Sequence, residues 1–523
     1  MIKMKNILKY NKYIFAGMLF VALSAFAYFF VERNVFYSFR YYIKITEKPV
    51  IYPDYADTVI PPNIAPLNFY INENGARYYV KVFSKKGKGI VIRSRNPGVK
   101  IPISRWRRLL TENKGNELYF EVSVKKENGW VKYSPLINKI AKEEIDSFLF
   151  YREIRPQFYR KIKMKICERN LENYAKRVIL DSKFTNGACF NCHSFLHNDT
   201  DKFIIQVRYD RRNYMAVNEG GRVSLIAPMS RKPGSAYLSW HPDGEKVALT
   251  MNMSYKVFNR FAGMVPEEVL EYGDLDGDIA LLNLKENSIL TVPGACRDGR
   301  IETQPAWSGD GRHLYFLSAP KVSSVKEYKK IKYDLMRVSY NAESNTWGNA
   351  ETLISSAETD MGVTFPKVSP DGRFLLFCMT DRSSFSILRA KTDLYLMDLK
   401  DNSYKRLEIN SENADSYHSW SSNSRWFVFA SKRDGGVFTR AYFSYIDEEG
   451  RVFKPFVLPQ REPYFYESFT SAYNVPEFSR GRIKLNRFYL TNALLDTKNI
   501  IDAKEIPGSA AAPAWDNKVN YNY

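Results

Sequence analysis

One short segment, "NGACFNCHSFLHNDTDKFIIQVR" from Asn186 to Arg208, concentrates residues that can do chemistry. Within it, Cys189, Cys192 and His193 have the spacing C-x-x-C-H. Two thiols at this spacing can add across the two vinyl groups of a haem, and the adjacent imidazole then reaches the iron. In a chain of 523 residues with five cysteines and five histidines, chance produces about 5 such matches in 10,000 sequences. The motif therefore predicts one covalent haem c, attached through Cys189 and Cys192, with His193 as the proximal iron ligand.

Three other functions of the motif stay open. A thiol–disulfide oxidoreductase uses C-x-x-C at a helix N-terminus in a thioredoxin-like fold, whereas an apolar, strand-like segment follows the motif here. A structural zinc site would use Cys189, Cys192 and His193 with His197 as the fourth ligand, although such close spacing strains a tetrahedral site. The two cysteines can also form a plain disulfide in an exported protein.

The N-terminal segment predicts export. Four lysines within the first twelve residues precede an uncharged, largely apolar run over 13–31, which is long enough to span a bilayer as a helix. We expect residues 1–33 to form an uncleaved signal anchor that holds the chain on the periplasmic side of the inner membrane. The alternative is a cleaved signal peptide, because Ala25 and Ala27 provide a small-x-small site.

The formal net charge of +20 suggests an anionic partner. Ten Lys or Arg and no Asp or Glu occur between Lys81 and Arg108. Because the chain is expected to be exported, we predict no nucleic-acid binding. The basic segment is either an ordinary solvated face or a surface that contacts anionic lipid headgroups or an acidic redox partner.

The composition pattern predicts a mainly β chain with several parts. Residues 34–66 are rich in proline and predict an extended linker. Residues 67–136 alternate with period two and have a turn at Glu127-Asn128-Gly129, so they predict a small β-sandwich that loosely resembles a fibronectin type III or immunoglobulin-like module. Residues 137–188 predict a helical connector, with helices over 138–154 and 167–180.

The rest of the chain repeats itself. Each repeat has an anchor residue, a tight turn and an alternating apolar strand, and the four copies are "YLSWHPDGEKVALTM" at Tyr237, "QPAWSGDGRHLYFLS" at Gln304, "FPKVSPDGRFLLFCM" at Phe365 and "YHSWSSNSRWFVFAS" at Tyr417. Such repeats are typical of a β-propeller. They resemble the W-S-P-D-G repeats of TolB-type six-bladed propellers. This resemblance implies a propeller over 189–500, with the segment from Ser468 closing the ring. The composition after Ile506, rich in Pro, Gly, Ala and Asn, predicts a flexible tail over 501–523.

The opening motif belongs to the same series. Aligning it with the repeat at Tyr417 puts Phe195 at the position of the anchor tryptophan and His193 at the position of His418. The predicted haem therefore lies at the entrance to the first blade. His241 and His418 each flank an anchor tryptophan and are candidates for the sixth iron ligand, the alternative for each being a hydrogen-bonded blade histidine.

These observations favour two functions. The first is a membrane-anchored, cytochrome-like propeller protein that acts in electron transfer or redox sensing with a protein partner. The second is a propeller scaffold that binds envelope proteins or glycans, with the C-x-x-C-H motif structural or without haem. The sequence has no G-x-S-x-G elbow, so an electron carrier or a binding protein is favoured over an enzyme. A disulfide between Cys167 and Cys296 is left open.

Overall fold

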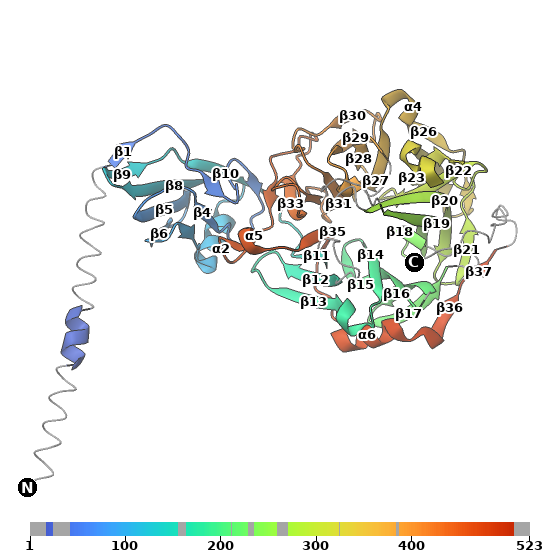
Figure 1. Ribbon diagram of the computed structural model, residues 1–523, viewed down its shortest axis with the longest axis horizontal. Helices are drawn as coiled ribbons and strands as arrows, with labels where there is room; N and C mark the ends of the chain where they lie inside the picture. Colours follow the sequence, from blue (N-terminus) through green and yellow to red (C-terminus); the bar gives the residue numbers. More distant parts are fainter. Residues whose placement is uncertain are drawn as a thin grey trace, which may run out of the picture.

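Six small sheets form the larger part of the chain, and a separate β domain precedes them (Figure 1). The computed structural model describes residues 17–24, 42–154, 164–210, 212–228, 235–258, 270–323, 325–382 and 386–506. The innermost strands of the six sheets neighbour one another in sequence order, and the last of them lies beside the first. The sheets are therefore the blades of a closed six-bladed propeller, as the repeats predicted.

Five blades are continuous in sequence, and each runs outward from its innermost strand. Blade 1 contains β14 (Cys189–Leu196), β15 (Asp199–Tyr209), β16 (Arg212–Glu219) and β17 (Arg222–Ala227). Blade 2 contains β18 (Ser235–Trp240), β19 (Lys246–Phe258), β20 (Leu270–Asn283) and β21 (Ser288–Thr291). Blade 3 contains β22 (Arg300–Trp307), β23 (His313–Pro320), β24 (Asp334–Asn341), β25 (Thr346–Trp347) and β26 (Glu351–Ile354). Blade 4 contains β27 (Gly362–Val368), β28 (Phe374–Thr380), β29 (Thr392–Asp398) and β30 (Tyr404–Arg406). Blade 5 contains β31 (Asp415–Trp420), β32 (Trp426–Ser431), β33 (Arg440–Tyr445) and β34 (Phe456–Val457).

The recurring turn joins the two inner strands of a blade. In blades 2, 3 and 4 its glycine has a positive φ, for example 73° at Gly244 and 72° at Gly372. Only glycine adopts this conformation without steric cost. The fourth repeat lacks the glycine, and Ser424 takes the same conformation with φ 59°. The turn is therefore kept in blade 5 although its sequence signal is missing.

Blade 6 closes the ring and combines the two ends of the propeller. Its innermost strand is β35 (Ala472–Ser479), which confirms that the segment from Ser468 closes the propeller. Its other strands come from before blade 1: β11 (Phe148–Ile154), β12 (Met164–Asn170) and β13 (Lys176–Asp181).

The predicted helical connector over 137–188 is therefore wrong. Both segments predicted as helices form strands, and one short 3-10 turn, Ser182–Phe184, is the only helical piece among the described residues there. A short apolar run such as Phe148–Tyr151 has no periodicity that separates a buried strand from a buried helix. β11 pairs on one side with the nearby β12 and on the other with β35, some 320 residues later, and local sequence could not reveal this second partner.

The N-terminal domain contains two sheets. The larger sheet consists of β1 (Tyr42–Lys44), β3 (Val59–Ile60), β5 (Arg77–Ser84), β6 (Ile90–Ser94), β8 (Glu117–Lys126), β9 (Gly129–Lys132) and β10 (Leu136–Ile140). The smaller sheet consists of β2 (Ile51–Tyr52), β4 (Phe69–Ile71) and β7 (Gly98–Val99). Helix α2 (Ile103–Glu112) buries Trp106, Leu109 and Leu110 against this core. The immunoglobulin-like classification stays a prediction.

Two predicted boundaries change. Residues 42–66, expected as linker, supply three strands and the fully buried Ile60 and Ile64, because these apolar side chains complete the core of the domain. The expected tail also begins later. After α6 (Arg487–Leu495), strands β36 (Ile500–Asp502) and β37 (Lys504–Glu505) add in parallel to the outer edges of blades 1 and 2. The tail beyond 506 lies outside the described residues.

Most of the predicted anchor, residues 1–33, also lies outside the described residues. The structure describes a helix over 17–24. Within the described part of the chain, no helix is both long enough and apolar enough to cross a bilayer.

One continuous apolar core joins the N-terminal domain to blades 5 and 6. At this joint the Ser422 backbone N–H and hydroxyl donate to the carboxylate of Asp146 at 2.8 and 2.6 Å. The indole N–H of the fully buried Trp426 donates to the Glu143 carbonyl at 3.3 Å, and the Tyr445 hydroxyl donates to the Glu143 carboxylate at 2.9 Å. The two parts are therefore fixed to each other. Two one-turn helices complete the fold, α4 (Ser356–Thr359) and α5 (Phe465–Ser468).

Candidate functional site

The C-x-x-C-H motif lies on β14, the innermost strand of blade 1. Cys189 pairs with Arg208 of β15 and His193 pairs with Ile205, so the motif is extended rather than helical. Cys189 is partly buried, and His193 is 6% exposed. The three motif residues thus belong to the first strand of blade 1. The side chain of Cys192 lies outside what the structure describes.

The innermost strand of every blade has a bulge of two residues, which in blade 1 lies one residue further from the inner turn than in blades 2 to 5. In blades 2 to 6 the first bulge residue has a positive φ: Tyr237, Gln304, Phe365, Tyr417 and Val475. In blade 1 the bulge falls between Phe190 and His193 and so contains Cys192. A bulge re-aims the side chains that follow it.

The residue just before each anchor position occupies an equivalent position around the ring. These six residues are Ser194, Ser239, Ala306, Lys367, Ser419 and Glu477. Phe195 pairs with Phe203 as Trp420 pairs with Phe427, so the register keeps His193 at the position of His418, as the repeat alignment predicted. His193 follows the bulge of its strand whereas His418 lies within the bulge of blade 5, so the two histidines have different surroundings.

His193 is buried beside a carboxyl group from the neighbouring blade. Its Nε2 lies 3.6 Å from Oε2 of Glu477, beyond hydrogen-bond distance, and its ring meets Phe195 edge-on. Among the described residues, neither ring nitrogen has a hydrogen-bond partner. Burial lowers the pKa of His193 to about 3, and the positive charges of Arg152 and Lys367 act in the same direction. The imidazole is therefore neutral at physiological pH.

Glu477, which is partly buried, is the second titratable group of the site. Its Oε1 accepts a hydrogen bond from the Phe195 backbone N–H at 3.0 Å, whereas Oε2 has no hydrogen-bond partner in the described part of the chain. Burial raises the pKa of Glu477 to about 8, although the Phe195 hydrogen bond and the charge of Lys367 oppose the rise. Near neutral pH the site therefore holds a protonated carboxyl beside a neutral imidazole.

Neither Glu477 nor Lys367 was predicted as a site residue. A signal was nevertheless present in the sequence. "VPEF" at Val475 has the pattern of "QPAW" at Gln304 and "FPKV" at Phe365, with proline as the second bulge residue and the ring position directly after it. Extending the repeat alignment to the closing strand would have placed Glu477 beside the motif.

The two candidates for a sixth ligand have partners of their own. Nδ1 of His241 lies 2.9 Å from Oδ2 of Asp243, and its Nε2 lies 3.2 Å from the Gly311 carbonyl. Nε2 of His418 lies 2.9 Å from the Leu376 carbonyl, and its Nδ1 lies 3.7 Å from Sγ of Cys378. Both are hydrogen-bonded blade histidines, which was the alternative expectation for each. Nothing in the described structure brings either of them into contact with His193.

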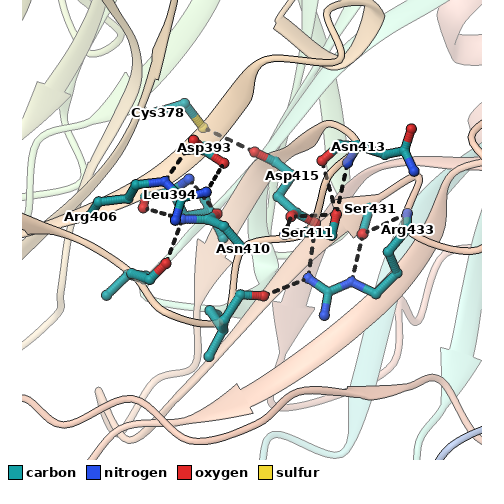
Figure 2. A network of polar contacts seen from close by, with 12 residues as sticks. Cys378, Asp393, Leu394, Arg406, Asn410, Ser411, Asn413, Asp415, Ser431 and Arg433 are labelled. Atoms are coloured by element: carbon teal, nitrogen blue, oxygen red, sulfur yellow. Dashed lines mark hydrogen bonds and ion pairs between the residues drawn. The ribbon is translucent and has the colours of Figure 1, made fainter.

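A second cluster of buried polar groups lies between blades 4 and 5 (Figure 2). The carboxylate of the fully buried Asp415 accepts from the Arg433 guanidinium at 3.0 Å and from both the backbone N–H and the hydroxyl of Ser411 at 2.6 and 2.9 Å. The thiol of Cys378 donates to the Asp415 carbonyl at 3.7 Å. A buried charge with this many partners stabilises packing between blades. This cluster is therefore structural, unlike His193, whose ring nitrogens have no hydrogen-bond partner among the described residues.

The other cysteines do not join the site. Cys167 lies in β12 of blade 6, and Cys296 follows β21 of blade 2. No disulfide links these two described residues. No group of three or more ligating side chains suited to a metal ion occurs among the described residues, which exclude the side chain of Cys192.

The sheet topology defines the class of the protein: a six-bladed β-propeller fixed to an N-terminal β domain. No family model and no curated protein matches the chain. Three solved structures that it resembles are propellers or proteins with such a domain. TolB from Acinetobacter baumannii is 12% identical with a TM-score of 0.40, covering 70% of this chain and 79% of that one. The β-propeller domain of the trilobed protease from Pyrococcus furiosus is 14% identical, TM-score 0.33, covering 67% and 96%. Regucalcin, a calcium-binding protein from Agrobacterium tumefaciens, is 15% identical, TM-score 0.33, covering 58% and 88%.

Proposed function

We propose that this chain is a scaffold that binds a protein or glycan partner in the cell envelope. The observation that carries the proposal is the joint between the N-terminal domain and blades 5 and 6. A continuous core with hydrogen bonds from Asp146 and Glu143 holds two different surfaces in one fixed orientation. A rigid pair of surfaces can bind a partner without first losing the entropy of ordering two domains. Propellers serve many functions, so the fold alone does not choose among them.

The test is whether the full chain, extracted from its native envelope, is bound to a partner. After solubilisation in a mild detergent and size-exclusion chromatography, we expect the chain to elute with a second component at a constant ratio across the peak. Elution as a single species of 60.8 kDa plus detergent would contradict the scaffold.

Electron transfer through a covalent haem is the second candidate. It is favoured by the C-x-x-C-H spacing together with the neutral His193, whose ring nitrogens have no hydrogen-bond partner among the described residues. A neutral imidazole with an available lone pair is what an iron ligand requires, so the chemistry of the donor set fits the group. Cys189 and Cys192 would hold the haem through thioethers, and His193 would ligate its iron. When bound, a haem c supplies one-electron transfer, and the partner would then be a redox protein.

A haem stain after denaturing electrophoresis tests this second candidate. The exported chain, produced together with the haem attachment machinery, should retain the stain. Cys192→Ala should lower it at least about tenfold, because the motif loses one of the two thiols that attach haem. Cys378→Ala is the matched control, since Cys378 is buried in blade 4 and should not affect staining. An unstained wild-type chain would exclude covalent haem.

A further inference from the structure

The basic segment between Lys81 and Arg108 contains some side chains that form ion pairs or hydrogen bonds and others that form neither. Lys100 forms an ion pair with Glu462, and the Arg107 guanidinium donates to the Glu172 carbonyl at 3.0 Å. These two residues therefore link the domain to segments on the propeller side. Among the described residues, no ion pair or hydrogen bond engages the side chains of five other exposed members of the segment: Lys85, Lys86, Lys88, Arg105 and Arg108. We refer to these five residues as the basic patch.

The structure holds the lysines of the patch in a defined turn between β5 and β6. The buried Asn113 accepts from the Lys86 backbone N–H at 2.8 Å and donates to the Lys86 carbonyl at 2.9 Å. Gly87 has φ 80°, which a residue with a side chain adopts only at a cost. The turn is thus tied to the end of helix α2, and its lysines project from a fixed backbone.

The arginines of the patch continue the same surface along α2. Arg105, Arg108 and Glu112 are three and four residues apart, so they form one exposed stripe of the helix. The Glu112 carboxylate lies against Gly87 and so connects this stripe to the lysine turn. The patch thus gathers five cations, with the Glu112 carboxylate beside the lysine turn. Clustered like charges repel each other, and an anionic partner relieves that repulsion.

The sheet register shows which end of the domain carries the patch. On β5, Arg77 pairs with Lys125 of β8 and Ser84 pairs with Leu118, so the lysine turn lies at the Leu118 end. Strand β1 begins at Tyr42 beside Trp130, which pairs with Lys125 at the other end. These two ends are about 24 Å apart at roughly 3.4 Å per residue. In Figure 1, β1 is on the side away from the propeller and α2 is on the side facing it.

This placement disfavours lipid headgroups as the partner. If the N-terminal segment holds the chain in a membrane, the Tyr42 end of the domain is nearest to the bilayer. The patch is then at the opposite end of the domain. Its distance from the bilayer exceeds the roughly 10 Å beyond which salt screens the interaction between surface charges. The ion pair between Lys100 and Glu462 also places this end beside the propeller, where an envelope partner has access to both parts.

We propose that the basic patch docks an acidic surface segment of a partner protein, beside the propeller. This inference rests on the proposed scaffold function and identifies where its partner binds and by what chemistry. Charge complementarity of this kind mainly raises the association rate and sets specificity, so binding should weaken steeply with salt.

The test uses the full chain, poly-L-glutamate as the acidic peptide, and vesicles of phosphatidylglycerol and phosphatidylcholine in equal amounts. The patch variant is Lys86→Glu, Lys88→Glu and Arg108→Glu. The matched control reverses the three exposed charges Lys400, Lys405 and Lys498, none of whose side chains forms an ion pair or a hydrogen bond in the described structure. Both variants change the net charge equally, and all six positions are exposed, so the fold should be kept.

We expect the patch variant to bind poly-L-glutamate at least about tenfold more weakly than the wild type, and the control to stay within about twofold. Equal losses in both variants would overturn the proposal, because overall charge would then explain binding. Patch-dependent binding to the vesicles that exceeds binding to the peptide would also overturn it, in favour of lipid. The peptide measurement needs no native partner, so failure of the scaffold in the envelope experiment is a separate result.

Discussion

The buried His193 and the partly buried Glu477 face each other, and among the described residues both ring nitrogens of His193 and Oε2 of Glu477 have no hydrogen-bond partner. Unsatisfied buried groups are rare in native proteins and require an explanation. The pair belongs to two innermost strands that meet where the propeller ring closes, so neither strand alone creates the site. It follows that the chemistry of this site depends on ring closure.

The opposite pKa shifts of the pair predict how stability depends on pH. Glu477, with its pKa raised to about 8, contributes stability below pH 4.5 that is lost as pH rises to about 8. His193, with its pKa lowered to about 3, contributes stability above pH 6.5 that is lost as pH falls to about 3. Between about pH 4.5 and 6.5 one contribution falls with pH while the other rises, so the two pH dependences cancel and their summed stability stays nearly constant.

Glu477→Gln isolates the first contribution. Glutamine mimics the protonated carboxyl and does not ionise. Raising the pH from 5 to 8 should therefore increase the free energy of unfolding of the variant relative to that of the wild type by on the order of 4 kcal/mol. Urea unfolding of the wild type and the variant at pH 5 and pH 8 measures this change, with both proteins produced without haem attachment. A difference between the two proteins that does not change with pH would contradict the pKa shift of Glu477.

The site could be predicted only in part from the sequence. Cys189, Cys192 and His193 were evident because their spacing is local. Glu477 was missed because it comes from a strand nearly 300 residues away, and only the alignment of inner strands brings it to His193. His241 and His418 were weighed as ligands on sequence position, whereas backbone groups are hydrogen-bonded to the rings of both.

At the scale of elements, the repeats predicted the propeller because each blade is built from a local turn between two strands. The outer strands of blade 6 were predicted as helices because their short apolar runs do not separate a strand from a helix, although β11, β12 and β13 pair with one another locally. Only β35, the inner neighbour of β11, is distant in sequence. Residues 42–66 were predicted as linker because short strands and prolines carry little pattern, although their apolar side chains are buried. Local signals thus failed where the pattern was too short, and they could not reveal the distant partner β35.

Closure by β35 can be tested by truncation. A chain that ends after Ser471 loses the innermost strand of blade 6 and exposes the edge of β11, including the fully buried Phe150. We expect it to aggregate or to be digested at least about tenfold faster by trypsin, because an unpaired apolar edge opens readily. A chain that ends after Ile506 is the control and should be as resistant as the full chain. Equal resistance of both truncations would contradict closure by β35.

At the scale of the whole molecule, the N-terminal domain and the propeller form one body. Their common core contains Trp426 from blade 5 together with Trp106 from helix α2 of the domain. Interfaces between domains of one chain are usually more polar than a core and permit motion. A shared apolar core instead couples the stability of the two parts, and it keeps the basic patch at a fixed position relative to the propeller.

This coupling predicts a single unfolding transition and a large effect of Trp426. We expect circular dichroism and tryptophan fluorescence to report the same urea midpoint. Trp426→Ala should lower the free energy of unfolding by about 3–5 kcal/mol, because it removes a fully buried indole from the joint and its hydrogen bond to Glu143. The midpoints of both probes should fall together.

Phe488→Ala is the matched control for the loss of a large aromatic side chain. Phe488 is 77% exposed on helix α6, so its removal should change the free energy of unfolding by less than about 0.5 kcal/mol. Two separate transitions in the wild type would mean that the domain and the propeller unfold independently. In that case the fixed orientation on which the scaffold depends would not hold, and the basic patch would have to recruit its partner without help from the propeller.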